Sequence, residues 1–288
     1  MGITFHEFKF LEYLTKNQKL GEVVTLGRLE VVMRPVDIEE LGLKRYLNDN
    51  NFFADEIILK KFEAKKLITI DNSNFEKANL IIDLNEPLKD NINKYDTVID
   101  FGTSEHVFNV GECIKNISKL CKINGNIIHS LPANNNCGHG FWQFSPELFF
   151  SIYCEENGYQ NTEVFIFDLT DREYVWKVEK QNPGERIELN SDVPLYIACK
   201  TTKIKDKDLR VQQSDYVFRW EDKKNVRDKS EKKFLSKLLK KIKVYIKDFI
   251  LSRSVFKNKL IRYEGRKFSS EKNFSKSKYL KKTSIKQI

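Results

Sequence analysis

The residues best suited to chemistry lie between positions 95 and 109, where an apolar run leads into a carboxylate, a glycine and a Glu-His pair. The run reaches Asp100, Gly102 follows, and Glu105 and His106 come directly after it. This pattern is typical of the carboxyl edge of a parallel sheet, where open α/β folds bind their ligands. A histidine there can act as a general base, because its ordinary pKa lies near neutral pH. The pair could equally form a pocket wall or be purely structural.

A second polar cluster spans residues 134–144 and follows the apolar run 126–132. His139 lies between two glycines, which permit a tight backbone path, and aromatic residues come after it. Aromatic rings beside amides suit a flat polar acceptor such as a sugar or a ring. Alternatively, the aromatic residues cover the core and His139 is an ordinary loop residue. We expect Glu105, His106 and His139 to converge on one cleft above the sheet, because their loops follow neighbouring strands.

Acids end three of the apolar runs, at Asp71, Asp83 and Asp100. A carboxylate after the second strand of a doubly wound sheet can accept both hydroxyls of an adenosine ribose, and one after the next strand can meet an adenine amino group. The alternative is that these acids only cap the segments that follow them, as Asp71 could.

Hydrophobic periodicity predicts an α/β fold. The expected strands are 22–27, 67–71, 80–84, 95–101, 126–132, 163–169 and 193–202, and helical spacing occurs in 5–14, 37–63, 110–122 and 145–157. Alternation of strands and helices indicates a doubly wound, mostly parallel sheet of seven strands. The last strand follows without a crossover helix, so it is expected to be antiparallel.

The chain resembles the class I S-adenosylmethionine-dependent methyltransferases over roughly residues 20–203. The segments that carry the resemblance are 23–28 (VVTLGR), 68–71 (ITID), 80–85 (LIIDLN), 96–106 (DTVIDFGTSEH) and 125–129 (GNIIH). The stretch from Phe101 to Asn109, followed by a helix and Gly-x-Ile-Ile, looks like the fourth and fifth motifs of that family.

The resemblance implies a Rossmann-like fold, S-adenosylmethionine as cofactor and methyl transfer as activity. It places Gly27 near the methionine part of the cofactor, Asp71 at the ribose and Asp83 beside adenine. It also implies that the segment from Asp100 through Gly102 to His106 faces the sulfonium and the acceptor. The first motif departs from the family, because Gly27 stands alone and Arg28 follows it. Arg28 could bind the cofactor carboxylate or could oppose the sulfonium.

Charge divides the chain into two parts. Residues 204–288 contain 27 Lys and Arg against 10 Asp and Glu, a net charge of +17, whereas residues 1–203 contain 23 against 31, a net charge of −8. We therefore expect a Rossmann-like domain over 1–203 and a basic C-terminal extension, helical or disordered, over 204–288. Apolar residues form a helical stripe within 229–251, which predicts an amphipathic helix that docks on an anionic membrane surface or on an acidic partner. Packing of this stripe on the body or in a homodimer is the alternative.

Cysteine and histidine spacing predicts neither a disulfide framework nor a metal site. The five cysteines contain no Cys-x-x-Cys pair, and no two histidines have the short spacing of helical or turn ligation. No uninterrupted apolar run approaches the roughly 20 residues of a membrane-spanning helix. A cytoplasmic location is expected, with attachment of the tail to the inner face of the membrane as a further option.

Two classes of function are compatible with these patterns, and a third fits less well. The first is a methyltransferase acting on a hydroxyl or amine of a small or carbohydrate-like acceptor. The second is a methyltransferase-like binding module that has lost catalysis through its glycine-poor first motif. A nucleic-acid methyltransferase fits less well, because the body lacks an Asn-Pro-Pro-Tyr or Asp-Pro-Pro-Tyr sequence.

Overall fold

The structure is a computed structural model, and it describes residues 2–47, 52–182, 185, 187, 189, 191–211 and 279–288. The elements in chain order are β1 (Gly2–Ile3), α1 (Phe5–Thr15), β2 (Glu22–Leu26), β3 (Glu30–Val31), α2 (Pro35–Glu40), η1 (Lys44–Tyr46), η2 (Ile57–Lys61), β4 (Lys66–Asp71), β5 (Leu80–Ile81), β6 (Tyr95–Phe101), η3 (Ser104–His106), α3 (Val110–Leu120), β7 (Cys121–Asn134), α4 (Pro146–Ile152), η4 (Glu155–Asn157), β8 (Tyr159–Phe167), β9 (Tyr174–Val178), β10 (Leu195–Lys203) and β11 (Leu280–Ser284). The η segments are 3₁₀ turns, except η2, which is a π-helix.

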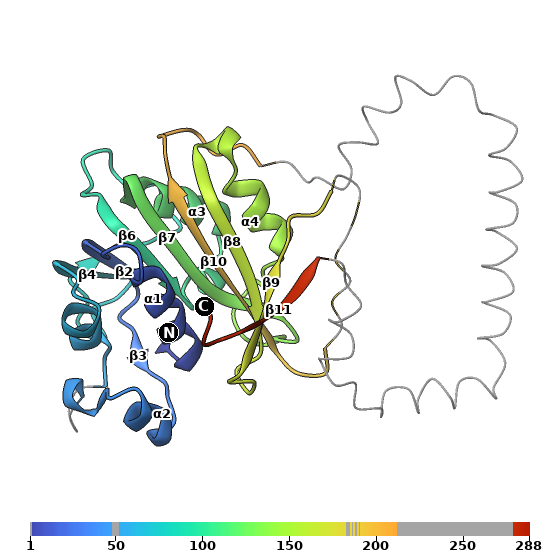
Figure 1. Cartoon of the computed structure of the whole chain (residues 1–288). Helices are drawn as coiled ribbons and strands as arrows, with labels where there is room; N and C mark the ends of the chain where they lie inside the picture. Colours follow the sequence, from blue (N-terminus) through green and yellow to red (C-terminus); the bar gives the residue numbers. More distant parts are fainter. Residues whose placement is uncertain are drawn as a thin grey trace, which may run out of the picture.

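A nine-stranded sheet organises the molecule, in the order β11-β9-β8-β10-β7-β6-β2-β4-β5 (Figure 1). The strands from β7 to β5 in this order run parallel to one another. Numbered along the chain, these five strands have the order 3-2-1-4-5 of a doubly wound Rossmann sheet. The direction of winding changes between the neighbouring strands β2 and β6. In this pair, Leu26 of β2 lies beside Asp100 of β6. Ligands of open α/β sheets bind at the carboxyl ends of such a strand pair.

The other half of the sheet is antiparallel. Strand β10 lies between β7 and β8 and is antiparallel to both, which confirms the expected direction of the last strand of the body. Strands β9 and β11 then extend the same edge, also antiparallel. Among the described residues the sheet has four parallel and four antiparallel pairings. The prediction of seven mostly parallel strands is therefore wrong, because β9 and β11 add two further strands to this edge, each antiparallel to its neighbour.

The end of the chain belongs to the body. Strand β11 pairs with β9, and the side chains of Ile285 and Ile288 are buried in a cluster with Phe5 of α1 and Phe165 of β8. The boundary predicted at residue 203 therefore does not hold for residues 279–288. The amphipathic helix predicted at 229–251 lies outside the described residues and stays a prediction.

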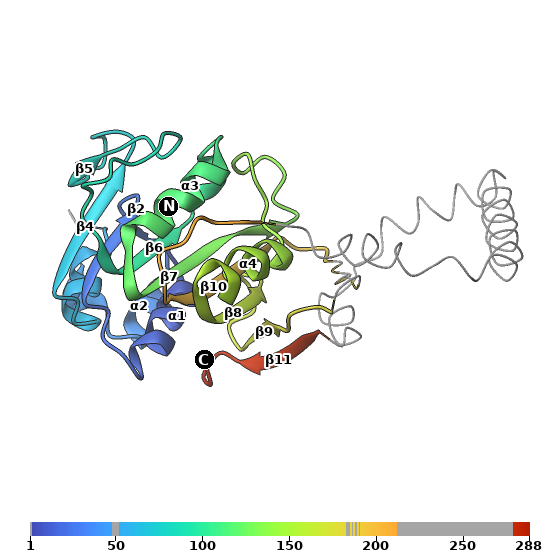
Figure 2. The ribbon, with the colours of Figure 1, turned by 90° about the horizontal axis from the view of Figure 1, so that it is seen from above.

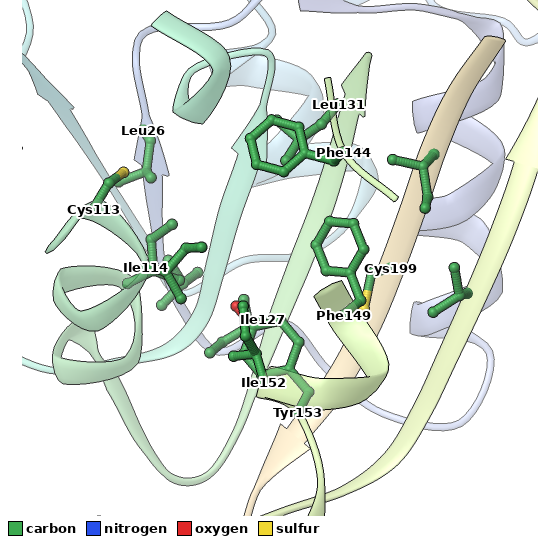
Figure 3. Packing of buried hydrophobic residues seen from close by; sticks show 14 of the residues in the cluster. Leu26, Cys113, Ile114, Ile127, Leu131, Phe144, Phe149, Ile152, Tyr153 and Cys199 are labelled. Atoms are coloured by element: carbon green, nitrogen blue, oxygen red, sulfur yellow. The ribbon is translucent and has the colours of Figure 1, made fainter. Parts of the chain in front are cut away.

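Helices cover both faces of the sheet (Figure 2). Successive residues of β2 point to opposite faces, so that Val24 packs in the cluster under α3 and α4, whereas Val23 packs under α1 and η2. Helix α3 contributes Cys113, Ile114 and Ile117 at helical spacing, and these residues meet the strands and α4 in the larger cluster (Figure 3). The helix predicted over 37–63 is instead divided into the short segments α2, η1 and η2.

None of the helices in the described part of the chain combines the length with the apolar character that crossing a bilayer requires.

Candidate functional site

A hollow of about 400 Å³, here called the first hollow, lies at the carboxyl ends of β2, β4 and β5. Gly27 lies on its wall, and its polar side chains are Asp71, Asn72, Asp83, Asn85, Thr103 and His106. Three of the six residues predicted to bind a cofactor thus share one wall, although they come from three separate parts of the chain.

Gly27 makes the turn after β2. Its φ of +74° lies in the left-handed region, which L side chains rarely adopt, and its amide donates a hydrogen bond to the carbonyl of Ile70 at 2.6 Å. The side chain of Thr25 donates to the carbonyl of Gly27 at 2.8 Å. This turn therefore requires a glycine, and the missing Cβ leaves the backbone accessible to a ligand in the first hollow.

Asp71 and Asp83 present carboxylates to the first hollow. Oδ1 of Asp71 accepts a hydrogen bond from the amide of Ser73 at 3.0 Å. Oδ1 of Asp83 accepts from the amide of Asn85 at 2.9 Å and from its side chain at 2.8 Å, and these bonds lower the pKa of Asp83. Within the described part of the chain, Oδ2 of neither acid has a hydrogen-bond partner, so both carboxylates can accept hydrogen bonds from a ligand.

A smaller hollow of about 260 Å³, the second hollow, adjoins the first. Its polar lining includes Glu7, Gly102, Glu105, His106, His139 and Tyr196. His106 lines both hollows and therefore separates them. Gly102 lies on the second hollow rather than the first, which places it away from Asp71 and Asp83.

Glu105, His106 and His139 do meet, as the positions of their loops predict. Nε2 of His139 lies 3.4 Å from Oε1 of Glu105, and Nε2 of His106 lies 3.9 Å from the same oxygen. The two imidazole rings are 5.2 Å apart at their centroids, with an angle of 68° between their planes. Burial raises the pKa of Glu105 to about 8, and the nearby Asp100 adds to this rise. Burial, with a contribution from His139, lowers the pKa of His106.

Contacts between the two loops hold this cluster together. The amide of Phe141 donates to the carbonyl of Glu105 at 2.7 Å, and the indole of Trp142 donates to the carbonyl of Val107 at 3.0 Å. Gly140 has φ of +71°, and a Cβ there would lie 2.8 Å from the Glu105 carbonyl oxygen. The glycine after His139 is therefore what allows its loop to approach Glu105.

Asp100 lies in the core beneath the site and does not face either hollow. Its side chain is fully buried, and its Oδ2 accepts from Ser104 Oγ at 2.6 Å and lies 2.8 Å from Nδ1 of His129. Its Oδ1 accepts from the amides of Thr103 and Ser104, both at 3.2 Å. Asp100 lines neither hollow, so its predicted contact with the cofactor is replaced by a positioning role for the turn that carries Glu105.

Arg28 also turns away from the first hollow. Its guanidinium pairs with Asp55 at 2.6 Å, donates to the carbonyl of Glu76 at 3.0 Å and lies over the ring of Phe53 at 4.0 Å. Arg28 does not line the first hollow, so its guanidinium is not directed at a cofactor there.

Glu7 and Asn85 are polar residues of the site that were not anticipated from the sequence. Glu7 on α1 is buried beside the second hollow, where its Oε1 accepts from Ser130 Oγ at 2.6 Å. The spacing of Thr4 and Glu7 is that of a capping box, and this pattern predicts the helix start but not its position over the sheet. Asn85 lines the first hollow, and its side-chain oxygen accepts from the amide of Asn109 at the start of α3.

Comparison with known proteins gives structural likenesses only. No family model and no curated protein matches the chain. A methyltransferase structure from Archaeoglobus fulgidus, dependent on S-adenosylmethionine, matches with 14% identity over 69% of this chain and 94% of the other, at a TM-score of 0.39. A putative methyltransferase from Bacillus halodurans matches with 12% identity over 68% and 98%, at a TM-score of 0.38. A possible histamine N-methyltransferase from Thermotoga maritima, also S-adenosylmethionine-dependent, matches with 13% identity over 69% and 91%, at a TM-score of 0.36. The chain is thus similar to solved methyltransferases over about two thirds of its length.

Proposed function

We propose that the chain is an S-adenosylmethionine-dependent methyltransferase that modifies a hydroxyl or an amine of a small-molecule or carbohydrate-like acceptor. The observation that carries this proposal is the pair of adjoining hollows at the carboxyl edge of the sheet, with His106 on the wall of both. A cofactor in one hollow and an acceptor in the other would meet at this residue.

The first hollow has the groups that an adenosyl cofactor needs. Asp71 at the end of β4 can accept hydrogen bonds from both ribose hydroxyls, and Asp83 after β5 can accept one from the adenine amino group. The turn at Gly27 leaves room for the methionine part of the cofactor. The sulfonium would then lie toward Thr103 and His106, on the side of the second hollow.

When bound, S-adenosylmethionine would supply an activated methyl group for an in-line displacement. The acceptor oxygen or nitrogen would form a bond to the methyl carbon as the carbon–sulfur bond breaks, and the electrons of that bond would stay on sulfur as the thioether. The acceptor loses one proton, which passes to water beside the cluster of Glu105, His106 and His139. Positioning supplies most of the rate enhancement, because the cofactor is already activated.

Cofactor binding tests this proposal. Titration calorimetry with S-adenosylmethionine should show one site on the wild-type chain and an affinity roughly 10- to 100-fold lower for Asp71→Asn, which removes a charged acceptor from the ribose. Asp90→Asn is the matched control, because Asp90 lies on the surface beside Lys119 and lines neither hollow. Equal affinity of Asp71→Asn and wild type would contradict the proposal, and absence of binding to the wild type would favour a non-catalytic binding module.

A further inference from the structure

Three side chains with metal-binding atoms face one another on the wall of the second hollow. One oxygen of Glu105 and one nitrogen each of His106 and His139 all lie within 4.8 Å of one another. A carboxylate and two imidazoles form a donor set typical of divalent transition metals, and three protein ligands leave positions open for other molecules. Short histidine spacing is absent from the sequence, but folding brings these ligands together from two loops.

The geometry is close to that of a bound ion. Ligand atoms about 2.0–2.2 Å from one ion lie roughly 3.0–3.6 Å apart, depending on the coordination geometry. His139 is already 3.4 Å from Glu105, and His106 is 3.9 Å away. The two histidine side chains are 51% and 52% exposed, so they can turn toward an ion without disturbing the core. Glu105 itself is held by the loop contacts at its carbonyl.

The buried carboxylate lacks the partner that an ion would provide. Glu105 is 1% exposed, and its Oε2 is buried without a hydrogen-bond partner in the described part of the chain. A buried carboxylate oxygen without a hydrogen bond is costly, which favours a cation beside it. Glu7 lines the same hollow, and its buried carboxylate adds negative potential there.

We propose that Glu105, His106 and His139 bind a divalent transition-metal ion on the wall of the second hollow. The use of this ion in catalysis rests on the proposed function. An acceptor oxygen at an open position of the ion would lose its proton to water more readily, before the new carbon–oxygen bond forms and the carbon–sulfur bond breaks.

Cobalt(II) is the probe, because its visible absorption reports ligation directly. Titration of the full chain with Co²⁺ should give visible ligand-field bands that saturate at one equivalent and disappear when Zn²⁺ is added. His139→Gln should weaken Co²⁺ binding at least about tenfold, the lower end of the losses found even for residues that only support a ligand. Glu105→Gln should weaken Co²⁺ binding by a similar factor. Because Glu105 is buried, this variant could fail to fold, and the exposed position of His139 makes His139→Gln the second test.

Two control variants separate the site from its surroundings and from the methyltransferase proposal. Cys137→Ser removes an exposed thiol from the loop of His139 and should leave Co²⁺ affinity unchanged. Asp71→Asn should lower S-adenosylmethionine affinity but leave Co²⁺ affinity unchanged, whereas His139→Gln should show the reverse. No Co²⁺ binding by the wild type, or equal binding by His139→Gln, would overturn the metal site and leave the cofactor proposal standing. Co²⁺ binding at this site without S-adenosylmethionine binding would overturn the function alone.

Discussion

Asp100 and His129 form a buried pair below the candidate site, with 2.8 Å between Oδ2 of the acid and Nδ1 of the ring. The other ring nitrogen of His129 lies 2.6 Å from the hydroxyl of Tyr153, so the pair joins β6 and β7 to the end of α4. Because Asp100 also accepts from Ser104, this network fixes the turn that carries Glu105 and His106.

Loss of the Asp100 carboxylate should therefore destabilise the whole fold. Asp100→Ala leaves the buried groups of His129 and Ser104 without their acceptor, and we expect the free energy of unfolding to fall by about 3 kcal/mol. Denaturant unfolding measures this change. Asp90→Ala, at a fully exposed position, should leave stability nearly unchanged. Equal midpoints for Asp100→Ala and wild type would show that the network does not position the turn.

Stability should decline on mild acidification because of His6. The ring is buried, stacks on Phe167 at 4.7 Å, and has Nε2 2.7 Å from the carbonyl oxygen of Asp171. Burial lowers the pKa of His6, although the negative charges of Glu7, Asp168 and Asp171 partly oppose this shift. The unfolded chain therefore binds a proton at a higher pH than the folded chain does. This contribution to stability is present above the unfolded pKa of about 6.5 and is lost as the pH falls toward the folded value.

The comparison with His6→Gln isolates this contribution. The variant keeps a hydrogen-bond donor but does not titrate in this range, so its free energy of unfolding should depend less on pH between about 6.5 and 5. Urea unfolding of both proteins across that range gives the difference. Parallel curves would mean that His6 takes up a proton equally well in the folded and unfolded chains.

The C-terminal strand should contribute to the stability of the body. Ile285 is buried in the cluster with Phe165 and Phe167, and its amide donates to the carbonyl of Glu173 at 2.8 Å. Ile285→Ala should cost about 2–4 kcal/mol through lost burial and the cavity left behind. The neighbouring Lys286 is exposed, so Lys286→Ala is the control and should change stability by less than about 0.5 kcal/mol. Equal stability of the two variants would show that the strand does not dock in solution.

Periodicity was sufficient to predict β2, β4, β5, β6 and β7, because buried parallel strands and their crossover helices have strong local patterns. The direction of β10 followed from the absence of a crossover helix before it. Periodicity did not predict β9 or β11. Strand β11 carries three charged or hydroxyl side chains between Leu280 and Ser284, and its place in the sheet arises from pairing with β9 at the edge. Such pairing depends on a distant part of the chain and gives little signal in the sequence of the strand itself.

The grouping of residues in the first hollow was predicted where it follows from the ends of strands. Gly27, Asp71 and Asp83 share the first hollow because the strand order places β2, β4 and β5 side by side. Arg28 and Asp100 were assigned to the cofactor from the same kind of position. In the structure, Arg28 pairs with Asp55 and Asp100 contacts His129. Both partners are distant in the sequence, so these contacts were not predicted. The convergence of Glu105, His106 and His139 was expected from loops that follow neighbouring strands, but histidine spacing within the sequence predicted no metal site there.

The structure of the full chain crystallised with S-adenosylhomocysteine tests the central claim most directly. The account predicts the ligand in the first hollow, with both ribose hydroxyls donating to the carboxylate of Asp71, the adenine beside Asp83 and the sulfur toward His106 and the second hollow. A ligand bound elsewhere, or one whose ribose does not contact Asp71, would contradict it.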